Sequence, residues 1–274
     1  MRNIILLFLF FSHTVCAATL TAKSWLVTDG EGNLIAGENM FDVRSIASVT
    51  KLMTVITVLD SKADLDTPLD IKYSINNKKN RKPKSSPYDN TTRRQLIDLA
   101  MVRSDNHAAK LLCTTYPFGY KQCIDDMNAK AKSLGMLQTV FYDPTGLDDR
   151  NNSSARDLVL LVRAGALYSE VVNASHKSKI QIKIKKRWFL GKNTNPLIGT
   201  RHEIQVSKTG WTTRAGGCIV MLLDTDRGQR IVVVLGSRSI RTRIPEAEFI
   251  SSIDASPEEK QQQQEPSNLW RRWF

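Results

Sequence analysis

Hydrophobic and polar positions divide the chain into segments with a strand period and segments with a helix period. Residues 24–29 and 33–38 alternate as strands do, and the Gly-Glu-Gly turn at 30–32 predicts that they form a hairpin. The next segment is apolar on nearly every side from residue 52 to residue 59. It predicts a buried central helix, which we expect to begin near Ser48.

The middle of the chain has the helical period. Thr91 and Thr92 resemble helix caps ahead of an apolar stripe that reaches Ala100, and this helix should end near Ser104. Three more helices are expected, at residues 106–115, 119–134 and 155–168. Ser104 and the two residues after it therefore lie on a loop between helices.

The last third of the chain returns to the strand period. Residues 180–184 alternate apolar and basic side chains, and three further apolar runs end at Lys208, Asp224 and Gly236. A closing helix is expected around Pro245, because proline is favoured in a first turn. Strands from both chain ends predict an α+β fold, in which helices flank an antiparallel sheet and an all-helical lobe is inserted at about residues 60–170.

The N-terminus has the pattern of a secretory signal peptide. Arg2 precedes an apolar run at residues 4–11, and the small residues expected before a cut stand at positions 15 and 17. The run is too short to favour a membrane-spanning helix. We therefore expect residues 1–17 to be removed on export, which leaves one main domain at residues 18–254.

The C-terminal segment 255–274 differs in composition from this domain. Its first part is polar and rich in glutamine, as linkers are, and it ends in aromatic and basic residues at 269–274. That combination suits the interface of a bilayer, so peripheral membrane contact through Trp270–Phe274 is one interpretation. A frayed tail is the other.

The formal net charge of the chain is +12, and five basic residues fall within residues 78–84. No aromatic residues are interleaved with them and no nucleic-acid-binding motif accompanies them, so we expect no nucleic acid partner. An acidic wall polymer or anionic lipid fits an exported basic protein better.

Three cysteines remain after the expected cut, too few and too loosely spaced for a zinc site. We expect no metal and no cofactor. Cys113 and Cys123 could form a disulfide in an oxidising compartment or remain free, and the sequence leaves both open. Cys218 lies in a strand-like apolar run and is expected to be an unreactive core thiol.

Candidate chemistry begins with Ser48 and Lys51, which are three residues apart. On a helix this spacing places the hydroxyl and the amine on one face. A lysine kept neutral by burial and by a second nearby cation could then take the serine proton, and amide groups at the helix N-terminus favour the negative charge that develops. A capped helix with a surface lysine would show the same spacing.

Two later motifs decide between these interpretations. Ser104-Asp105-Asn106 and Lys208-Thr209-Gly210 follow Ser48-x-x-Lys51 in the order found in penicillin-binding proteins and class A β-lactamases. The chain resembles the serine D,D-peptidases among the low-molecular-mass penicillin-binding proteins, and within them the D-alanyl-D-alanine endopeptidase branch. The likeness runs from about Ser24 to Gly236 and includes residues 142–148, 193–197, 207–211 and 215–221.

The resemblance implies a β-lactamase/D,D-peptidase-like fold and an acyl-enzyme mechanism in the periplasm. Ser48 would be the nucleophile, Lys51 the general base and Ser104 a proton relay to the leaving amine. The backbone amides of Ser48 and Trp211 would receive the oxyanion. Substrate binding would fall to Asn106, Lys208, Thr209 and Gly210, whereas Asp105 is expected to be structural. The implied partners are the peptide stems of peptidoglycan and, as inhibitors, β-lactam antibiotics.

Four other kinds of protein fit parts of this pattern. A class A β-lactamase needs a glutamate to activate water, and residues 39–169 contain none. Asp148 or Asp149 could substitute in principle, but the segment around them lacks the rest of the loop that such an enzyme uses. A Ser-His-Asp hydrolase is disfavoured because no histidine has a nucleophile-elbow context, and His107 is expected on a helix surface. A D,D-carboxypeptidase would use the same residues, but its relatives usually carry a further β-rich domain. A sensor that stays acylated by β-lactam is the fourth.

Overall fold

The computed structural model describes residues 20–71 and 87–254. At its centre is a five-stranded antiparallel sheet with the strand order β2-β1-β9-β8-β7. Its strands are β1 (Ser24–Asp29), β2 (Leu34–Glu38), β7 (Glu203–Thr212), β8 (Gly216–Thr225) and β9 (Gly228–Ser237). All six residues of β1 pair with β9, so an early strand and the last strand of the described residues pair inside the sheet, as the sequence predicts.

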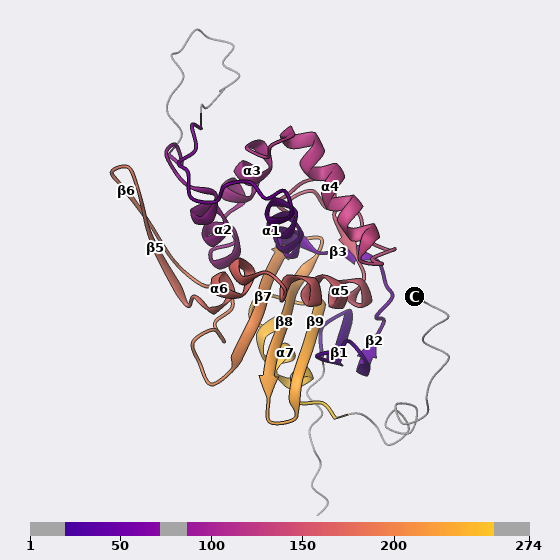
Figure 1. Ribbon diagram of the computed structural model, residues 1–274. Coiled ribbons are helices and arrows are strands. Elements are labelled where there is room, and N and C mark those ends of the chain that lie inside the picture. Colours follow the sequence, from indigo (N-terminus) through magenta and orange to yellow (C-terminus); the bar gives the residue numbers. More distant parts are fainter. Residues whose placement is uncertain (1–19, 72–86, 255–274) are drawn as a thin grey trace, which may run out of the picture.

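Helices and two small ribbons surround this sheet (Figure 1). The helical segments are η1 (Ala47–Val49), α1 (Thr50–Asp60), α2 (Arg93–Val102), α3 (Asn106–Thr114), α4 (Gly119–Ser133), α5 (Ala155–Gly165), α6 (Ser169–His176) and α7 (Arg243–Ser251). The ribbons pair β3 (Arg44–Ser45) with β4 (Asn152–Ser153), and β5 (Lys179–Ile184) with β6 (Arg187–Lys192).

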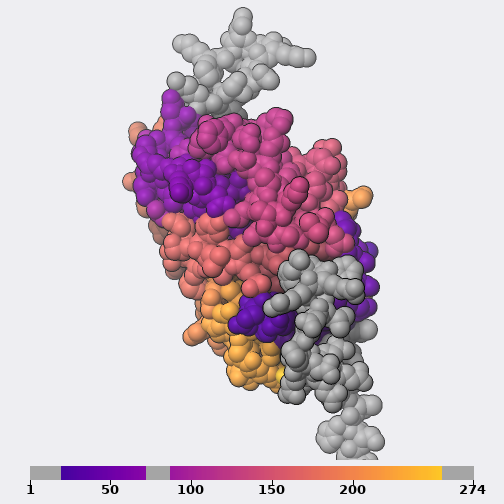
Figure 2. All heavy atoms as spheres, turned by 45° about the vertical axis from the view of Figure 1, so that its right-hand side comes forward, coloured from indigo at the N-terminus to yellow at the C-terminus, as the bar shows by residue number. Residues whose placement is uncertain are grey.

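Both faces of the sheet are covered, because alternate side chains of each strand point to opposite faces. On one face Val232 and Val234 of β9 pack with Ala247 and Ile250 of α7. On the other face Val233 belongs to a larger apolar core that takes in α1 and the helices around it. Figure 2 shows the result from another side, with the magenta helices in the upper part and the yellow C-terminal residues at the lower end.

Helix α1 is the centre of this larger core. Every residue from Thr50 to Val58 is buried, which agrees with the apolar pattern of the segment. Its start differs slightly from the prediction, because Ser48 lies in the 3-10 turn η1 and the α-helix begins two residues later. Ser48 is therefore placed just ahead of a rigid, fully packed helix.

Three expectations about the elements need correction. Residues 155–168 form no single helix: α5 ends at Gly165, Tyr168 is extended, and α6 follows at a bend of 101°. Strand β7 continues to Thr212, four residues beyond the expected end at Lys208. Strand β6 was not expected, since its sequence Arg-Trp-Phe-Leu-Gly-Lys lacks clear alternation.

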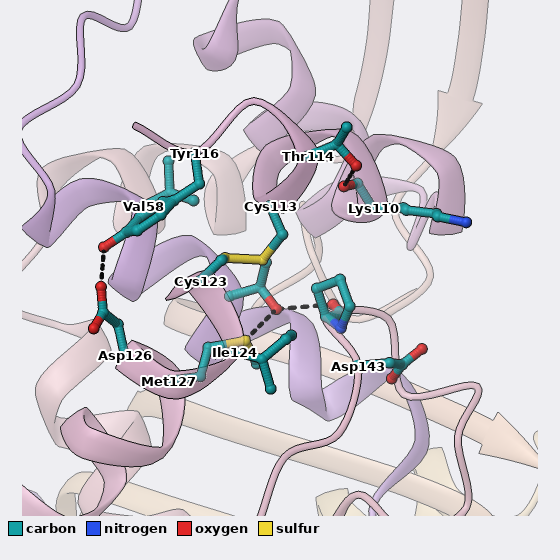
Figure 3. Close-up of a disulfide and its surroundings, with 12 residues drawn as sticks. Val58, Lys110, Cys113, Thr114, Tyr116, Cys123, Ile124, Asp126, Met127 and Asp143 are labelled. Carbon is teal, nitrogen blue, oxygen red and sulfur yellow. Dashed lines mark hydrogen bonds between the residues drawn. A yellow bond between two sulfur atoms is a disulfide. The ribbon is translucent and has the colours of Figure 1, made fainter. Parts of the chain in front are cut away.

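The open question about the cysteines has a definite answer. Cys113 of α3 and Cys123 of α4 form a disulfide, with their Cα atoms 5.4 Å apart and both side chains buried (Figure 3). Beside it, the Tyr116 hydroxyl donates to Asp126 across the same turn, at 2.7 Å. Cys218 is free and buried, and burial raises the pKa of its thiol to about 11, which keeps it unreactive as expected.

The expected signal peptide, the basic segment 78–84 and the tail 255–274 lie outside the described residues. Within residues 20–71 and 87–254 no single helix is long and apolar enough to cross a membrane. Among the same residues, α5 and α6 reach the length and apolar content of a membrane span only when the two helices are counted together across their bend.

Candidate active site

Ser48 and Lys51 meet where η1 passes into α1. The Lys51 side chain is completely buried, and its Nζ lies 2.7 Å from Ser48 Oγ. The same amine donates to Asn106 Oδ1 at 2.7 Å and to the carbonyl oxygen of Thr145 at 2.6 Å. Lys51 therefore joins the central helix to the start of α3 and to the loop after α4.

The environment of Lys51 makes its amine easy to deprotonate. Burial lowers the pKa of this amine from 10.5 to about 7, although the negative charges of Asp143 and Asp105 act in the opposite direction. Near neutral pH both protonation states are accessible. The uncharged amine can accept the Ser48 proton while it still donates to Asn106 and Thr145.

The loop that carries Thr145 is built to present its backbone. The Asp143 carboxylate accepts hydrogen bonds from the Thr145 hydroxyl and from the amide of Gly146. Asn151, which is fully buried, donates to the carboxylate and the carbonyl of Asp143. Gly146 has φ of 79°, and an added Cβ would lie 1.8 Å from the carbonyl oxygen of Ala47. Only glycine fits this contact between the loop and the Ser48 turn.

Ser104 lies on the loop between α2 and α3, as the sequence predicts, with φ of 57°. The next residue, Asp105, caps α3 by accepting from the amides of His107 and Ala108 at 2.9 Å each. It also accepts from the Tyr88 hydroxyl at 2.8 Å. Asp105 thus has the structural role expected of it, fixing the loop that offers the side chains on either side.

Strand β7 supplies the opposite wall of the site. Lys208 is buried, and its Nζ donates to Ser104 Oγ and to the carbonyl oxygen of Thr209, both at 2.9 Å. Burial, together with the charges of Lys51 and Arg243, holds the pKa of Lys208 well below its ordinary value. Any positive charge that either lysine carries therefore acts on the site with little solvent to screen it.

Gly210 lets β7 come close to the nucleophile. A Cβ at this position would lie 2.9 Å from the Ile46 carbonyl oxygen and 3.0 Å from the Ser48 amide nitrogen. The backbone of Gly210 and Trp211 consequently lies against the turn that carries Ser48. Trp211 is 44% exposed, so it lies at the surface rather than in the core.

Of the eight residues named from the sequence, the structure brings Ser48, Lys51, Ser104, Asn106, Lys208 and Gly210 together, and Thr209 and Trp211 flank Gly210 on β7. Asn106 is the first residue of α3 rather than part of the loop before it. Side-chain hydrogen bonds join Ser48, Lys51 and Asn106 on one side, and Ser104 with Lys208 on the other. Among the described residues, no group of three or more His, Cys, Asp or Glu side chains could hold a metal ion. The arrangement offers a hydroxyl, a base, a second hydroxyl and cationic binding groups, which is the chemistry of acyl transfer.

Comparison with known proteins agrees with this chemistry. A peptidase S11 family model, described as D-alanyl-D-alanine carboxypeptidase, matches residues 12–239. The chain belongs to this family of serine D,D-peptidases. The family indicated by the three motifs is therefore confirmed, and with it the assignment as a hydrolase.

Two relatives and one solved structure show how similar this D,D-peptidase is to known members in sequence and fold. It is 37% identical to a D-alanyl-D-alanine endopeptidase of Pseudomonas aeruginosa, over 83% of this chain and 75% of the relative. It is also 37% identical to a D-alanyl-D-alanine endopeptidase of Escherichia coli, over 76% of this chain and 69% of the relative. Penicillin-binding protein D2 of Listeria monocytogenes, solved with cefotaxime bound, matches with a TM-score of 0.71 at 25% identity, over 86% and 97% of the chains. This match confirms the predicted fold class.

Three groups of the D,D-peptidase site were missed from the sequence. The Thr145 carbonyl was missed because a backbone acceptor leaves no mark in the type of residue. Thr194 receives a hydrogen bond from the Thr209 hydroxyl at 2.7 Å, and Arg243 donates to the Gly210 carbonyl at 2.7 Å. Segments 142–148 and 193–197 carried the resemblance, which was the available signal for the first two, whereas nothing pointed to Arg243.

His107 and His202 of this D,D-peptidase have other surroundings than a catalytic triad. His107 was expected on a helix surface, but it is half-buried with its ring centroid 4.7 Å from that of Tyr88. His202 lies 3.0 Å from Glu248 of α7, at the far end of β7 from Gly210. Burial lowers the pKa of His107, which matches packing against an aromatic ring rather than proton transfer at neutral pH.

Proposed function

We propose that this enzyme is a D,D-endopeptidase that cleaves D-alanyl cross-links between peptide stems of peptidoglycan, with Ser48 as its nucleophile. The observation that carries the chemistry is the 2.7 Å contact of Ser48 Oγ with the buried amine of Lys51. The type of bond rests on the two relatives at 37% identity, both named D-alanyl-D-alanine endopeptidase.

Acylation begins with the uncharged form of Lys51. This amine takes the proton of Ser48 as Oγ attacks the carbonyl carbon of a D-alanine residue, and a tetrahedral oxyanion forms. The amides of Ser48 and Trp211 receive that oxygen, which is supported by the close approach of β7 to the Ser48 turn. Collapse of the intermediate breaks the peptide bond and leaves the acyl group on Oγ.

The leaving amine needs a proton, and we assign its relay to Ser104. The proton taken up by Lys51 passes through the Ser104 hydroxyl, which accepts a hydrogen bond from Lys208 at 2.9 Å. Water then attacks the acyl carbonyl, with Lys51 again as base, and Ser48 is released. Each proton removed from a nucleophile is thus returned to a leaving group.

Substrate is held between Asn106 and strand β7. β7 is an edge strand of the described sheet, so an extended peptide can add to its free side by backbone hydrogen bonds. The carboxylate of such a peptide pairs with Lys208 and Thr209, and its negative charge restores the charged form of Lys208. Asn106 binds a substrate amide with the part of its side chain that Lys51 leaves free.

The same site should be acylated by β-lactam antibiotics, which present a strained amide to the serine. Support comes from penicillin-binding protein D2 of Listeria monocytogenes, whose solved structures include cefotaxime-bound and ampicillin-bound forms. A rigid bicyclic amide needs no features beyond those that accept the peptide. We therefore include penicillin among the covalent ligands of Ser48.

A second candidate is a D,D-carboxypeptidase, which would release the terminal D-alanine from an uncross-linked stem. The description of the family model favours it, and the two reactions share every catalytic group. The difference lies in what occupies the leaving side of the site: one free D-alanine, or the side-chain amine of a second stem.

The deciding experiment gives the purified enzyme cross-linked muropeptide dimers and uncross-linked pentapeptides in parallel. Conversion of dimers to monomers supports the endopeptidase. Release of free D-alanine with the dimers intact supports the carboxypeptidase instead. A stable penicillin adduct without turnover of either substrate would replace both with a β-lactam sensor.

We also propose that the enzyme works in the periplasm as a domain of residues 18–254, exported by residues 1–17, with peripheral membrane contact through Trp270–Phe274. Support comes from the signal-peptide pattern and the aromatic, basic end of the chain. Deleting residues 267–274 should move the protein from the membrane pellet to the supernatant. Equal fractionation of full-length and truncated protein would contradict the membrane contact.

A further inference from the structure

The hairpin formed by β5 and β6 stands apart from the main sheet and extends beside α2 (Figure 1). Residues opposite each other in its register share a face. Ile180, Ile182 and Ile184 are buried in the main core, with Phe189 packed against them. The other face carries three pairs that point to solvent: Lys179 with Lys192, Gln181 with Leu190, and Lys183 with Trp188.

The hairpin is fixed in place at both ends. At its base the amide of Asn193 donates to the Ser178 carbonyl at 2.7 Å. Towards its tip, Phe189 packs on Tyr88 with ring centroids 4.9 Å apart, and Lys185 forms an ion pair with Asp89. The outward face is therefore a preformed surface, which costs little conformational entropy when it binds a ligand.

We call this surface the lysine–tryptophan face: Lys179, Lys183, Lys192, Trp188 and Leu190. Among the described residues, none of its three lysines has a carboxylate within ion-pair distance. Trp188 is 54% exposed and Leu190 is 58% exposed. The Lys183 amine lies 5.6 Å from the centroid of the Trp188 ring. Positive charge and apolar area thus alternate on one surface.

The lysine–tryptophan face begins beside the active site. Lys192 lies two residues before Thr194, which receives the hydrogen bond from the Thr209 hydroxyl. The backbone of Gly191 packs on Arg103, since an added Cβ would lie 2.3 Å from its Cδ, and Arg103 precedes Ser104. From its base the face extends four residues along the strands, or about 13 Å.

We propose that the lysine–tryptophan face binds the carboxylate-bearing peptide stems and sugar rings of the peptidoglycan strand whose cross-link lies in the active site. The inference rests on the proposed function, because it takes peptidoglycan as the substrate. Free carboxylates of the stems pair with the lysines, and Trp188 stacks on the apolar faces of sugars or stem side chains. The face would hold a long polymer more tightly than a small substrate.

An anionic membrane is the other partner that basic and aromatic residues can bind. Two exposed apolar side chains, Trp188 and Leu190, offer little area to insert into a bilayer. The position beside Thr194 favours a ligand that continues out of the active site. We therefore assign the face to the polymer and treat lipid as an outcome of the test.

Binding to insoluble cross-linked peptidoglycan tests the proposal in a Ser48→Ala background, where no turnover occurs. The triple variant K179Q/K183Q/K192Q should bind about tenfold more weakly in a pelleting assay at low salt, as expected for three exposed ion pairs. Raised salt should weaken the parent and leave the triple variant nearly unchanged. The matched control removes three exposed lysines from other elements and should bind like the parent: K62Q/K110Q/K132Q.

Trp188 is tested separately, because its contribution should not depend on salt. W188A should weaken binding at high salt as well as at low salt, and W188F should restore most of it. Equal unfolding temperatures for all these variants show that the hairpin remains folded. Peptidoglycan with its carboxylates converted to amides should bind the parent about as weakly as native polymer binds the triple variant.

Two results would overturn the proposal. Equal binding of the parent and the hairpin triple variant to peptidoglycan means that the face does not hold the polymer. If the triple variant loses binding to vesicles with one-third anionic phospholipid but binds the polymer like the parent, the face is assigned to membrane instead. Because the assay measures binding without catalysis, these results are independent of whether the wild-type enzyme proves to be an endopeptidase.

Discussion

At the scale of single residues, the buried amine of Lys51 has the most demanding surroundings. Its three hydrogen-bond partners, Ser48, Asn106 and Thr145, come from separate elements, so the amine is held in one position. Burial favours the uncharged form and the Asp143 carboxylate favours the charged one. Their balance places the pKa near the pH at which the base has to work.

Acylation should therefore follow the deprotonation of Lys51. With a pKa of about 7, the rate of labelling by penicillin should rise about tenfold per pH unit below that value and level off above it. The rise has this sign because only the uncharged amine accepts a proton. A rate that falls between about pH 5 and 7 would exclude Lys51 as the general base.

The negative charge of Asp143 should determine the pH at which the labelling rate rises. This charge raises the pKa of Lys51, so Asp143→Asn should lower that pKa and move the acid limb of the profile to lower pH. Asp148 in the same loop pairs with Arg150, and D148N is the matched control. An unchanged limb in D143N, with reduced rates at every pH, would leave Asp143 only a structural role.

The sequence predicted which side chains would come together better than it predicted the groups that hold them in place. A hydroxyl, a lysine and two later motifs can be recognised because their chemistry depends on residue type. The Thr145 carbonyl and the Asn151 amide act through contacts between distant segments, which no spacing along the chain reveals. We expected burial and a second nearby cation to keep Lys51 neutral. Burial is the largest cause of its lowered pKa, and the nearby cation is Lys208, whose own pKa the charge of Lys51 lowers.

At the scale of elements, the site depends on how closely β7 approaches η1. Gly210→Ala should slow acylation by penicillin about 100-fold, as loss of one oxyanion donor does, because its Cβ would push β7 away from the Ser48 amide. Gly228→Ala controls for strain, since that turn has φ of 91° and open space around the added Cβ. Wild-type rates in G210A would show that the approach of the strand is not needed.

The disulfide joins the helix that begins with Asn106 to its neighbour α4. It closes a loop with a sequence separation of 10, so its loss should cost roughly 3 kcal/mol of unfolding free energy. Reductant should then lower the urea midpoint of the wild type, with no effect on C113A/C123A. Identical midpoints for the wild type with and without reductant would contradict this stabilising role.

Helices and strands with a strong hydrophobic periodicity were predicted correctly, whereas those with a weak or interrupted periodicity were not. The buried helix α1 and strand β1 have patterns that only one structure satisfies. The break between α5 and α6 was missed, because the apolar pattern continues through Gly165 and the chain turns only at Tyr168. β6 was missed because its outward side chains include Trp188 and Leu190, which hide the alternation.

At the scale of the whole molecule, the helical part and the sheet share one core. Leu112 of α3 and Met127 of α4 belong to the same buried cluster as Leu26 of β1 and Val233 of β9. Over its described residues, the inserted lobe therefore has no separate core of its own to keep it folded. The order of strands and helices was predictable from the pattern, but this shared core was not, because it depends on long-range contacts.

Unfolding should accordingly be a single transition. Urea curves followed by far-ultraviolet circular dichroism, which reports mainly the helices, should coincide with curves from the fluorescence of Trp25 and Trp211 on the sheet. A variant with Trp188, Trp270 and Trp273 each changed to Phe leaves Trp25 and Trp211 as its tryptophans. Two separated midpoints would show that the helical lobe and the sheet unfold independently.

The most direct test of the whole account is to locate the covalent adduct. Purified enzyme is treated with a labelled penicillin, digested, and its modified peptide sequenced by mass spectrometry. The adduct should lie on Ser48, disappear in folded Ser48→Ala, and form at least about 100-fold more slowly in Lys51→Ala. An adduct on another residue, or labelling that persists in Ser48→Ala, would contradict the central claim.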